Sequence, residues 1–159
     1  MKKTLLIHDI RSVHNVGSMF RTADAAGFDH IYISGYSPRP TDRFGRIRQD
    51  IHKAALGAEQ SVSWSGHDDA LELIREKKSQ GVLIIGIEQD DTSVGLFDYD
   101  TLGDDTEVLV VMGNEVDGIS QELLDACGVV IEIPMYGNKE SLNVSVSFGI
   151  VAYALFHKK

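Results

Sequence analysis

The sequence predicts an α/β fold, in which a doubly wound, mainly parallel sheet is covered by helices on both faces. Short apolar runs rich in β-branched residues alternate with amphipathic stretches along the 159 residues. The runs are apolar at both odd and even positions, which is typical of strands buried on both faces of a parallel sheet. No repeat, low-complexity tract or Pro/Gly-rich linker interrupts the alternation. We therefore expect one domain over residues 1–159 with right-handed crossover connections.

The individual elements follow from these patterns. The predicted strands are 4–9, 30–35, 82–88, 107–113 and 129–134. Helices are expected at 16–26, 50–56, 68–78 and 120–126, and in the C-terminal segment. In the 68–78 stretch, Leu71 and Ile74 form an apolar stripe, and Gly81 follows as a stop signal.

The segment "KESLNVSVSFG", residues 139–149, fits two structures. Its strict alternation of polar and apolar residues suits a half-buried strand, but Leu142, Val146, Ile150 and Tyr153 recur at helical spacing. A strand here would follow the 129–134 strand without a crossover helix. Ser and Asn suit the first turn of a helix, where their side chains satisfy exposed N–H groups. We therefore expect a helix that begins near Ser141.

Composition limits the class of protein. The 43% of hydrophobic and 25% of charged residues are ordinary for a soluble globular protein, and no apolar run is long enough to cross a bilayer. The N-terminal segment has no cleavage site, so we interpret it as a first strand and not as a signal peptide. The single cysteine, Cys127, excludes an internal disulfide framework and suits the cytoplasm.

The charge is distributed unevenly. The formal net charge of −9 argues against nonspecific nucleic-acid binding by the whole surface. Residues 39–53, however, carry five basic against two acidic residues, a local balance of +3, while the rest of the chain balances at −12. The basic residues of this segment are Arg39, Arg43, Arg46, Arg48 and Lys53. It is either a docking site for a polyanion or a solvated loop with incidental arginines.

The first of three polar segments at predicted strand ends is "HNVGSMFRTADAAG", residues 14–27. Open α/β sheets place their ligand sites at the carboxyl ends of strands. Asn15 can cap the following helix, and Gly17 allows a close approach of backbone. Arg21 would project from the first turns, where its guanidinium could bind a phosphate at two points. The alternative is a surface arginine on an ordinary amphipathic helix.

The second segment is "VMGNEVDGIS", residues 111–120. An apolar strand runs directly into Gly113, Asn114 and Glu115, and Gly118 follows. Such a turn exposes backbone polar groups beside a carboxylate. It is neither a Walker loop nor a G-x-G-x-x-G dinucleotide motif, and alone it could be a simple turn before a helix.

The third segment is "IEIPMYGNKESLNVSVS", residues 131–147. Pro134 ends the strand, Gly137 permits a turn, and Ser141 and Asn143 open the last helix. A loop of this size over a strand end can wrap a flat ligand with main-chain hydrogen bonds. The serines could also serve only as helix caps.

Metal and nucleophile signals are absent. The calcium-loop-like start at Asp98 fails because Leu102 and Leu109 stand where ligands belong. The histidines show no paired spacing, so we expect no metal, and no G-x-S-x-G signature occurs. Cys127 is interpreted as a small core residue.

Taken together and in this order, the three segments resemble the motifs of the SpoU (TrmH) family of RNA ribose 2′-O-methyltransferases, in the SPOUT superfamily. "NVGSMFR" resembles the family's Asn-x-Gly-x-x-x-Arg motif, and "GNEVDG" is similar to its Gly-x-Glu-x-x-Gly motif. "IPMYGNKESLNVSV" resembles its third signature almost unaltered. "HKAALGAEQSV", residues 52–62, is similar to the family's connection between its second and third strands. The resemblance covers nearly the whole chain, and the third motif is specific by itself.

The resemblance implies a cofactor, a knot and a homodimer. The family binds S-adenosylmethionine in a C-terminal trefoil knot, and both subunits of its homodimer border each active site. By this analogy, backbone groups of Gly113, Ile133 and Leu142 would hold the adenosine, with Met135 nearby. No folding rule would have suggested the knot, because knots are essentially absent from most folds.

The resemblance also implies catalytic residues, for which we prefer a phosphate-mediated scheme. The family assigns an activating role to the arginine matching Arg21, but a guanidinium is not deprotonated in proteins. As a hypothesis, Arg21 fixes a substrate phosphate, and this phosphate together with Ser141 and Asn143 helps to take the proton of the ribose hydroxyl. Asn15 would orient Arg21 or the ribose, and Glu115 would hold the second loop near Asn15.

The expected substrate is RNA, either tRNA or ribosomal RNA. Many family members add an RNA-binding domain, for which this chain has no room. RNA would then be held by the 39–53 segment, duplicated in the dimer, or by a helper protein. The alternative is a non-catalytic RNA-binding or assembly factor that retains the fold, although the intact catalytic set counts against it. A flavodoxin-like carrier would leave the third motif unexplained.

Overall fold

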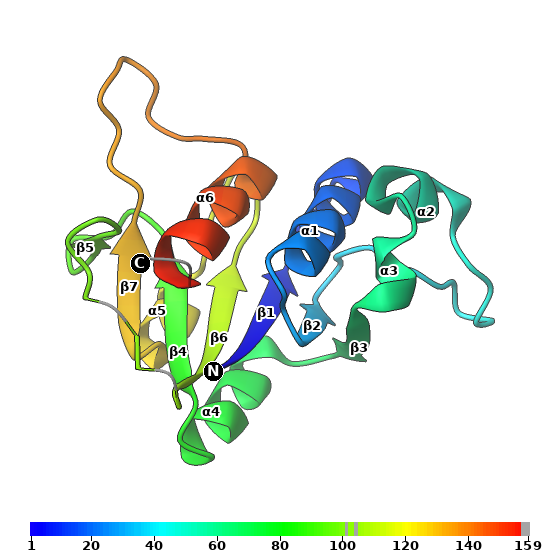
Figure 1. Cartoon of the computed structure of the whole chain (residues 1–159), viewed down its shortest axis with the longest axis horizontal. Coiled ribbons are helices and arrows are strands. Elements are labelled where there is room, and N and C mark those ends of the chain that lie inside the picture. Colours follow the sequence, from blue (N-terminus) through cyan, green and yellow to red (C-terminus); the bar gives the residue numbers. More distant parts are fainter. Residues whose placement is uncertain (101, 104, 157–159) are drawn as a thin grey trace.

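The computed structural model describes residues 1–100, 102–103 and 105–156. Within these residues a single seven-stranded sheet is formed, and every neighbouring pair of strands is parallel. The strands are β1 Lys2–His8, β2 His30–Ser34, β3 Ser63–His67, β4 Leu83–Ile87, β5 Val94–Gly95, β6 Glu107–Met112 and β7 Val129–Glu132. Their order across the sheet is β3-β2-β1-β6-β4-β7-β5 (Figure 1).

Helices cover both faces of the sheet, as the sequence predicts. They are α1 Val13–Ala25, α2 Gln49–Ala55, α3 Ala58–Ser61, α4 Ala70–Ser79, α5 Gln121–Ala126 and α6 Val144–Phe156. One buried cluster joins the sheet to α1, α2, α3 and α6, and a second joins its other face to α4 and α5. In Figure 1, α6 lies beside α1 although the two helices are at opposite ends of the chain.

All five predicted strands form, with bounds that shift by one or two residues. The sequence did not predict β3, whose residues are the largely polar "SWSGH". This edge strand is paired on one side only, and its Ser63 and Ser65 hydroxyls meet the ring nitrogens of His30 at 2.8 Å. An edge strand of this kind lacks the apolar run by which a buried strand is recognised. The short elements β5 and α3 were missed for the same lack of pattern.

The prediction that Asn15 caps the first helix was wrong. The helix α1 begins at Val13, and Ser12 is its cap, with a side-chain oxygen that accepts the Asn15 N–H at 3.2 Å. Asn15 therefore lies inside the first turn, which leaves its side chain available for other contacts.

The last segment is helical, which resolves its ambiguous pattern. Helix α6 begins at Val144, and the Asn143 side-chain oxygen accepts the N–H groups of Ser145 at 2.9 Å and Val146 at 3.3 Å. Asn143 thus opens the helix as predicted, whereas Ser141 lies before it in the loop.

Gly17 makes the close approach that the sequence indicated, and its neighbour is helix α2. A Cβ atom at position 17 would lie 2.4 Å from the Ala54 Cβ and 2.9 Å from backbone atoms of Ala54 and Ala55. Only glycine lets α1 and α2 pack at this distance.

In the described part of the chain, no helix combines the length and the apolar character that a membrane span needs.

Candidate functional site

The site lies where the connections of the sheet change direction. After β1 the chain crosses over one face through α1, and after the neighbouring β6 it crosses over the other face through α5. At such a point the loops that leave the two strands separate and open a crevice at the carboxyl edge of the sheet. The second motif is the loop that leaves β6, and the first motif lies in α1, directly after the loop that leaves β1.

Glu115, in the loop after β6, binds the start of α1. Its carboxylate accepts the backbone N–H of Arg11 at 3.1 Å and that of Ser12 at 3.0 Å. The Asn15 side-chain amide donates to the same carboxylate at 3.1 Å. Burial alone raises the pKa of Glu115, but these hydrogen bonds outweigh it and hold the pKa below its ordinary value. The carboxylate is therefore ionised and keeps the first and second motifs together.

Asn15 also forms a hydrogen bond with the third motif. The Asn143 side-chain amide donates to the Asn15 side-chain oxygen at 3.1 Å. A chain of hydrogen bonds, Asn143–Asn15–Glu115, thus joins residues that lie 128 and 100 positions apart in sequence. The structure brings these three predicted site residues into direct contact.

Asn114 shapes the second loop and was not predicted as a site residue. It is buried, and its side-chain oxygen accepts the N–H groups of Val116 and Asp117 at 2.8 Å. Its amide donates to the Asp9 carbonyl at 2.8 Å and to the Tyr36 hydroxyl at 2.9 Å. Asn114 therefore connects the ends of β1, β2 and β6. An asparagine two residues after the end of a buried strand is the sequence signal that could have identified it.

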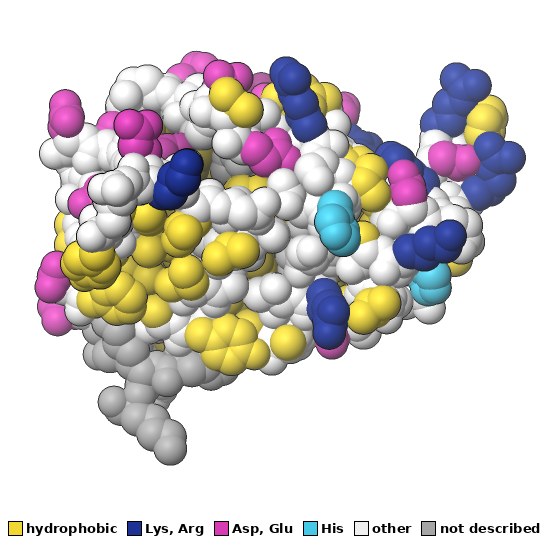
Figure 2. Space-filling view, turned by 90° about the horizontal axis from the view of Figure 1, so that it is seen from above, with side chains coloured by type: hydrophobic (Ala, Val, Ile, Leu, Met, Phe, Trp, Pro, Cys, Tyr) yellow, Lys and Arg dark blue, Asp and Glu magenta, His cyan; other side chains and the backbone are white. Residues whose placement is uncertain are grey.

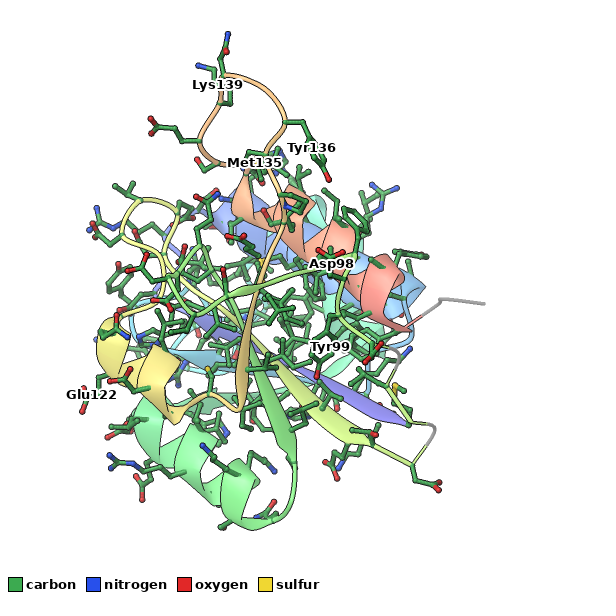
Figure 3. All side chains as sticks on the ribbon, turned by 90° about the vertical axis from the view of Figure 1, so that its left-hand side faces the viewer. Asp98, Tyr99, Glu122, Met135, Tyr136 and Lys139 are labelled. Carbon is green, nitrogen blue, oxygen red and sulfur yellow. The ribbon has the colours of Figure 1, made fainter. Side chains whose placement is uncertain are left out.

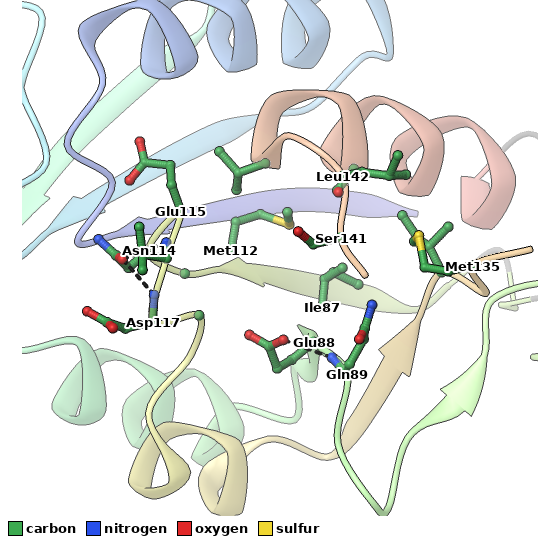
Figure 4. A pocket seen from close by; sticks show the side chains of 16 residues that line it. Ile87, Glu88, Gln89, Met112, Asn114, Glu115, Asp117, Met135, Ser141 and Leu142 are labelled. Atoms are coloured by element: carbon green, nitrogen blue, oxygen red, sulfur yellow. Dashed lines mark hydrogen bonds between the residues drawn. The ribbon is translucent and has the colours of Figure 1, made fainter. Parts of the chain in front are cut away.

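A pocket of about 200 Å³ opens between the ends of β4, β6 and β7 and the start of α6 (Figure 4). The predicted cofactor-binding residues Gly113, Ile133, Met135 and Leu142 all line it. The predicted catalytic residues that line it are Glu115 and Ser141. The other lining residues are Ile87, Glu88, Gln89, Met112, Asn114, Val116, Asp117, Gly118, Val144 and Ser147.

Glu88 and Gln89, at the end of β4, were also missed. The Glu88 carboxylate accepts the Ile119 N–H at 3.0 Å, which fixes the end of the second loop, and the Gln89 N–H at 2.9 Å. The Gln89 amide donates to the Glu140 carbonyl at 2.7 Å and so holds the 133–143 loop against the pocket. Glu88 directly follows the buried strand β4, and an acidic residue in that position is the sequence signal that could have identified it.

The 133–143 loop projects from the body of the protein. In Figure 3, Met135, Tyr136 and Lys139 lie on this loop above the sheet. Tyr136 is 89% exposed, whereas Met135 turns toward the pocket that it lines. The loop thus forms one wall of the pocket and leaves its tip in solvent.

Arg21 does not line the pocket. It is exposed on α1 and has no hydrogen bond or ion pair with the residues that the structure describes. Six residues after Asn15, it lies about 9 Å further along the helix axis. The structure therefore separates Arg21 from Asn15, Glu115 and Asn143 within one chain.

Three of the five predicted RNA-binding residues are ion-paired. Arg39 lies 3.6 Å from Asp68, Arg46 2.7 Å from Asp42, and Arg48 2.7 Å from Asp50. Arg43 and Lys53 make no ion pair within the described residues. Exposed ion pairs contribute little to stability, so these arginines can exchange a carboxylate for a phosphate.

Comparison with known proteins identifies the family to which these motifs are similar. Residues 2–153 match the SpoU rRNA Methylase family. Curated relatives include a "Putative TrmH family tRNA/rRNA methyltransferase" from Staphylococcus haemolyticus, which is 31% identical over all 159 residues, and a protein of the same description from Staphylococcus aureus, which is 32% identical. The chain spans 60% of the length of these relatives.

Solved structures share the fold. An AdoMet-bound rRNA methyltransferase from Sinorhizobium meliloti matches 96% of this chain with a TM-score of 0.85 and 25% identity, over 55% of its own length. A TrmH/SpoU tRNA modifying enzyme from A. aeolicus matches 96% of this chain with a TM-score of 0.81 and 27% identity, over 73% of its own length.

Proposed function

Because the chain belongs to the SpoU rRNA methylase family, we propose that it transfers a methyl group from S-adenosylmethionine to the 2′-hydroxyl of a ribose in tRNA or ribosomal RNA. The Asn143–Asn15–Glu115 chain of hydrogen bonds carries this proposal. It joins all three motifs, and its member Glu115 lines the same pocket as the predicted cofactor-binding residues.

The pocket has the chemistry that an adenosine group needs. Ile87, Ile133 and Leu142 offer apolar surface to a flat purine, and the backbone of the Gly113 turn offers hydrogen-bonding groups. S-adenosylmethionine bound there would supply an electrophilic methyl group on its sulfonium. Backbone groups of Gly113, Ile133 and Leu142 would hold the adenosine, and Met135 would lie against it.

The residues around the pocket then have separate roles. Arg21 binds a phosphate of the RNA and so positions the ribose, because its guanidinium has no competing carboxylate in the described structure. This phosphate, together with Ser141 and Asn143, helps to remove the proton of the 2′-hydroxyl. Asn15 orients the substrate from α1, and Glu115 holds Asn15 in place.

A homodimer would complete this site. The exposed face of α6 carries Val146 and Tyr153, each 50% exposed, and Leu142 lies just before the helix at 41% exposed. A helix that is apolar on nearly all sides is usually covered. A second copy of the chain packed on α6 and the adjacent α1 would cover this face and bring a second Arg21 toward the pocket. The trefoil knot, with α6 threaded through a loop, belongs to the same proposal.

The RNA would be held by the 39–53 segment, present twice in the dimer, or with the help of a second protein. A loop or single-stranded region is the favoured target, because its nucleotides are accessible to side chains.

The test combines binding and turnover. Isothermal titration with S-adenosylhomocysteine should give about one site per chain on a sample whose dimer state is checked. Labelled S-adenosylmethionine with total tRNA and with ribosomal RNA should then yield 2′-O-methylated nucleotides after nuclease digestion. A folded dimer that binds RNA but not S-adenosylhomocysteine would instead support a non-catalytic RNA-binding factor.

A further inference from the structure

Phe44 stands at the tip of the 39–48 loop as an exposed aromatic residue between two cations. Its side chain is 67% exposed. The guanidinium of Arg43 lies 4.7 Å from the ring centroid, and that of Arg46 lies 5.1 Å from it. A large apolar side chain that faces water forgoes the favourable free energy of burial.

The loop is an ordered hairpin. Thr41 and Ile47 pair in an antiparallel bridge, and the Asp42 N–H donates to the Arg46 carbonyl at 2.9 Å. Gly45 has a φ of +77°, which allows the tight reversal after Phe44.

The Asp42 carboxylate fixes the tip of this hairpin. It accepts the backbone N–H of Phe44 at 2.8 Å and that of Arg46 at 3.0 Å, and the Arg46 side chain pairs with it at 2.7 Å. These hydrogen bonds hold the pKa of Asp42 below its ordinary value, with the Arg46 backbone making the largest contribution. The aromatic ring is therefore presented from a backbone that is already ordered, which reduces the entropy lost on binding.

The charge around Phe44 favours a polyanion as its partner. Figure 2, which looks onto the edge where the strands end, shows Lys and Arg side chains gathered at the end of the molecule that carries this hairpin and α2. Acidic side chains lie mainly over the opposite end. Arg43 makes no ion pair within the described residues, so it can move from the ring to a phosphate and uncover the ring further.

The hairpin follows a segment of chain that contacts the candidate site. Its chain leaves the end of β2, which lies two strands from β6, roughly 10 Å away. The Tyr36 hydroxyl, at the base of the loop, accepts a hydrogen bond from pocket-lining Asn114 at 2.9 Å. Arg11 lies over the Tyr36 ring at 5.4 Å. A single strand that leaves the pocket past Arg11 and Tyr36 would run toward the hairpin.

We propose that Phe44 stacks on an unpaired RNA base while Arg43 and Arg46 bind the adjoining phosphates. This hairpin then holds single-stranded RNA next to the nucleotide that is modified. The inference rests on the proposed function, because it names the structural class of RNA that the site accepts. Base stacking tolerates every base, so the hairpin contributes affinity and register and does not read sequence.

The test measures the binding of a fluorescein-labelled single-stranded RNA of about 12 nucleotides by anisotropy. Phe44→Ala should weaken binding about 5- to 100-fold, while Phe44→Trp retains it. Ile47→Ala is the matched control, because Ile47 is 51% exposed on the same hairpin and has no guanidinium over it. Its binding should stay within about twofold of the wild type.

Salt dependence separates stacking from charge. Arg43→Gln should reduce the slope of log K against log salt concentration by about 0.7, the value for one phosphate contact of a single strand. Phe44→Ala should leave this slope unchanged, because the phenyl ring releases no counterions.

Each remaining outcome has a distinct meaning. If the wild type binds RNA and Phe44→Ala binds equally well, the stacking role is overturned and the proposed function stands. If Phe44→Leu binds as well as the wild type, the contact is apolar and does not need an aromatic ring. Such a contact is typical of a protein partner, and the inference is again overturned. If the wild type binds S-adenosylhomocysteine but neither single-stranded nor duplex RNA, the RNA part of the proposed function fails together with this inference.

Discussion

The Asn143 side-chain amide donates a hydrogen bond to the Asn15 side-chain oxygen at 3.1 Å, and so joins the start of α6 to the start of α1. Asn143 uses its other polar atom to cap α6, and Asn15 uses its own amide to bind Glu115. Each asparagine acts as donor and acceptor at once, a combination that neither aspartate nor leucine can supply.

Substitution of Asn143 can separate its two contacts. Asn143→Ala removes the cap and should lower the free energy of unfolding by about 1 kcal/mol. Asn143→Asp keeps a capping oxygen at a helix N-terminus but cannot donate to Asn15, so its stability should stay near that of the wild type while methyl transfer falls. Urea unfolding and a methyl-transfer assay measure the two effects. Full activity of Asn143→Asp would show that the contact with Asn15 has no part in turnover.

Glu115→Gln tests the charge that holds the loops together. The amide oxygen of Gln can still accept hydrogen bonds, but its NH2 group cannot replace the second carboxylate oxygen as an acceptor. The variant also loses the charge that strengthens the bonds from Arg11, Ser12 and Asn15. We expect a loss of about 1 kcal/mol in the free energy of unfolding and weaker S-adenosylhomocysteine binding. Glu122→Gln, at an exposed site on α5, is the control for the loss of one negative charge and should leave S-adenosylhomocysteine binding unchanged.

Arg21→Ala should abolish methyl transfer and leave S-adenosylhomocysteine binding nearly unchanged. Arg21 is exposed and lies outside the pocket, so its removal leaves the cofactor-binding residues in place. Isothermal titration and a labelled-methyl assay on the same preparation measure both properties. Arg75→Ala, on the exposed face of α4, serves as the control for the loss of one positive charge. Equal loss of binding and turnover would contradict the assignment of Arg21 to the RNA.

Gly17→Ala should destabilise the fold through the α1–α2 contact. The added Cβ would lie 2.4 Å from that of Ala54 and 2.9 Å from backbone that cannot move independently. We expect a loss of roughly 1–3 kcal/mol in urea unfolding, which is typical of overpacking. Gly137→Ala is the matched control, because no atom lies within 4 Å of its added Cβ. A stability of Gly17→Ala equal to that of Gly137→Ala would contradict the packing of the two helices.

Stability should fall as the pH drops through the range in which histidine titrates. Burial lowers the pKa of His8 against the opposing effect of Asp9, and burial together with the neighbouring His67 lowers the pKa of His30. Below the unfolded value of about 6.5, the unfolded chain therefore binds more protons than the folded one, which destabilises the fold. Urea midpoints at about pH 7.5 and about pH 5.5 should show this loss.

Substitutions of single histidines test which residues cause the pH dependence of stability. His8→Gln and His30→Gln should each flatten the dependence of the urea midpoint on pH, because each removes one of the two groups. His14→Gln, on the exposed surface of α1, should keep the slope of the wild type. An unchanged slope in the first two variants would contradict their assignment.

Local pattern sufficed for the buried strands of this protein and for every helix except the short α3. Strand runs such as 107–113 are apolar on both parities because both faces of the sheet are covered, and this leaves a signature that is readable without coordinates. The polar edge strand β3 leaves no such signature, and the first helix begins earlier than Asn15 suggests because Ser12 provides the cap.

The sequence by itself determined the α/β alternation, the helical nature of the last segment and the three motifs of the family. Only the tertiary structure decided which of their side chains meet. The Asn143–Asn15–Glu115 chain exists because the order of strands places β1 beside β6, and that order follows from long-range packing and not from local pattern. The roles of Asn114 and Glu88 depend on the strand order in the same way. Their hydrogen-bond partners lie far away in sequence and come into reach only when the strand ends meet in the fold.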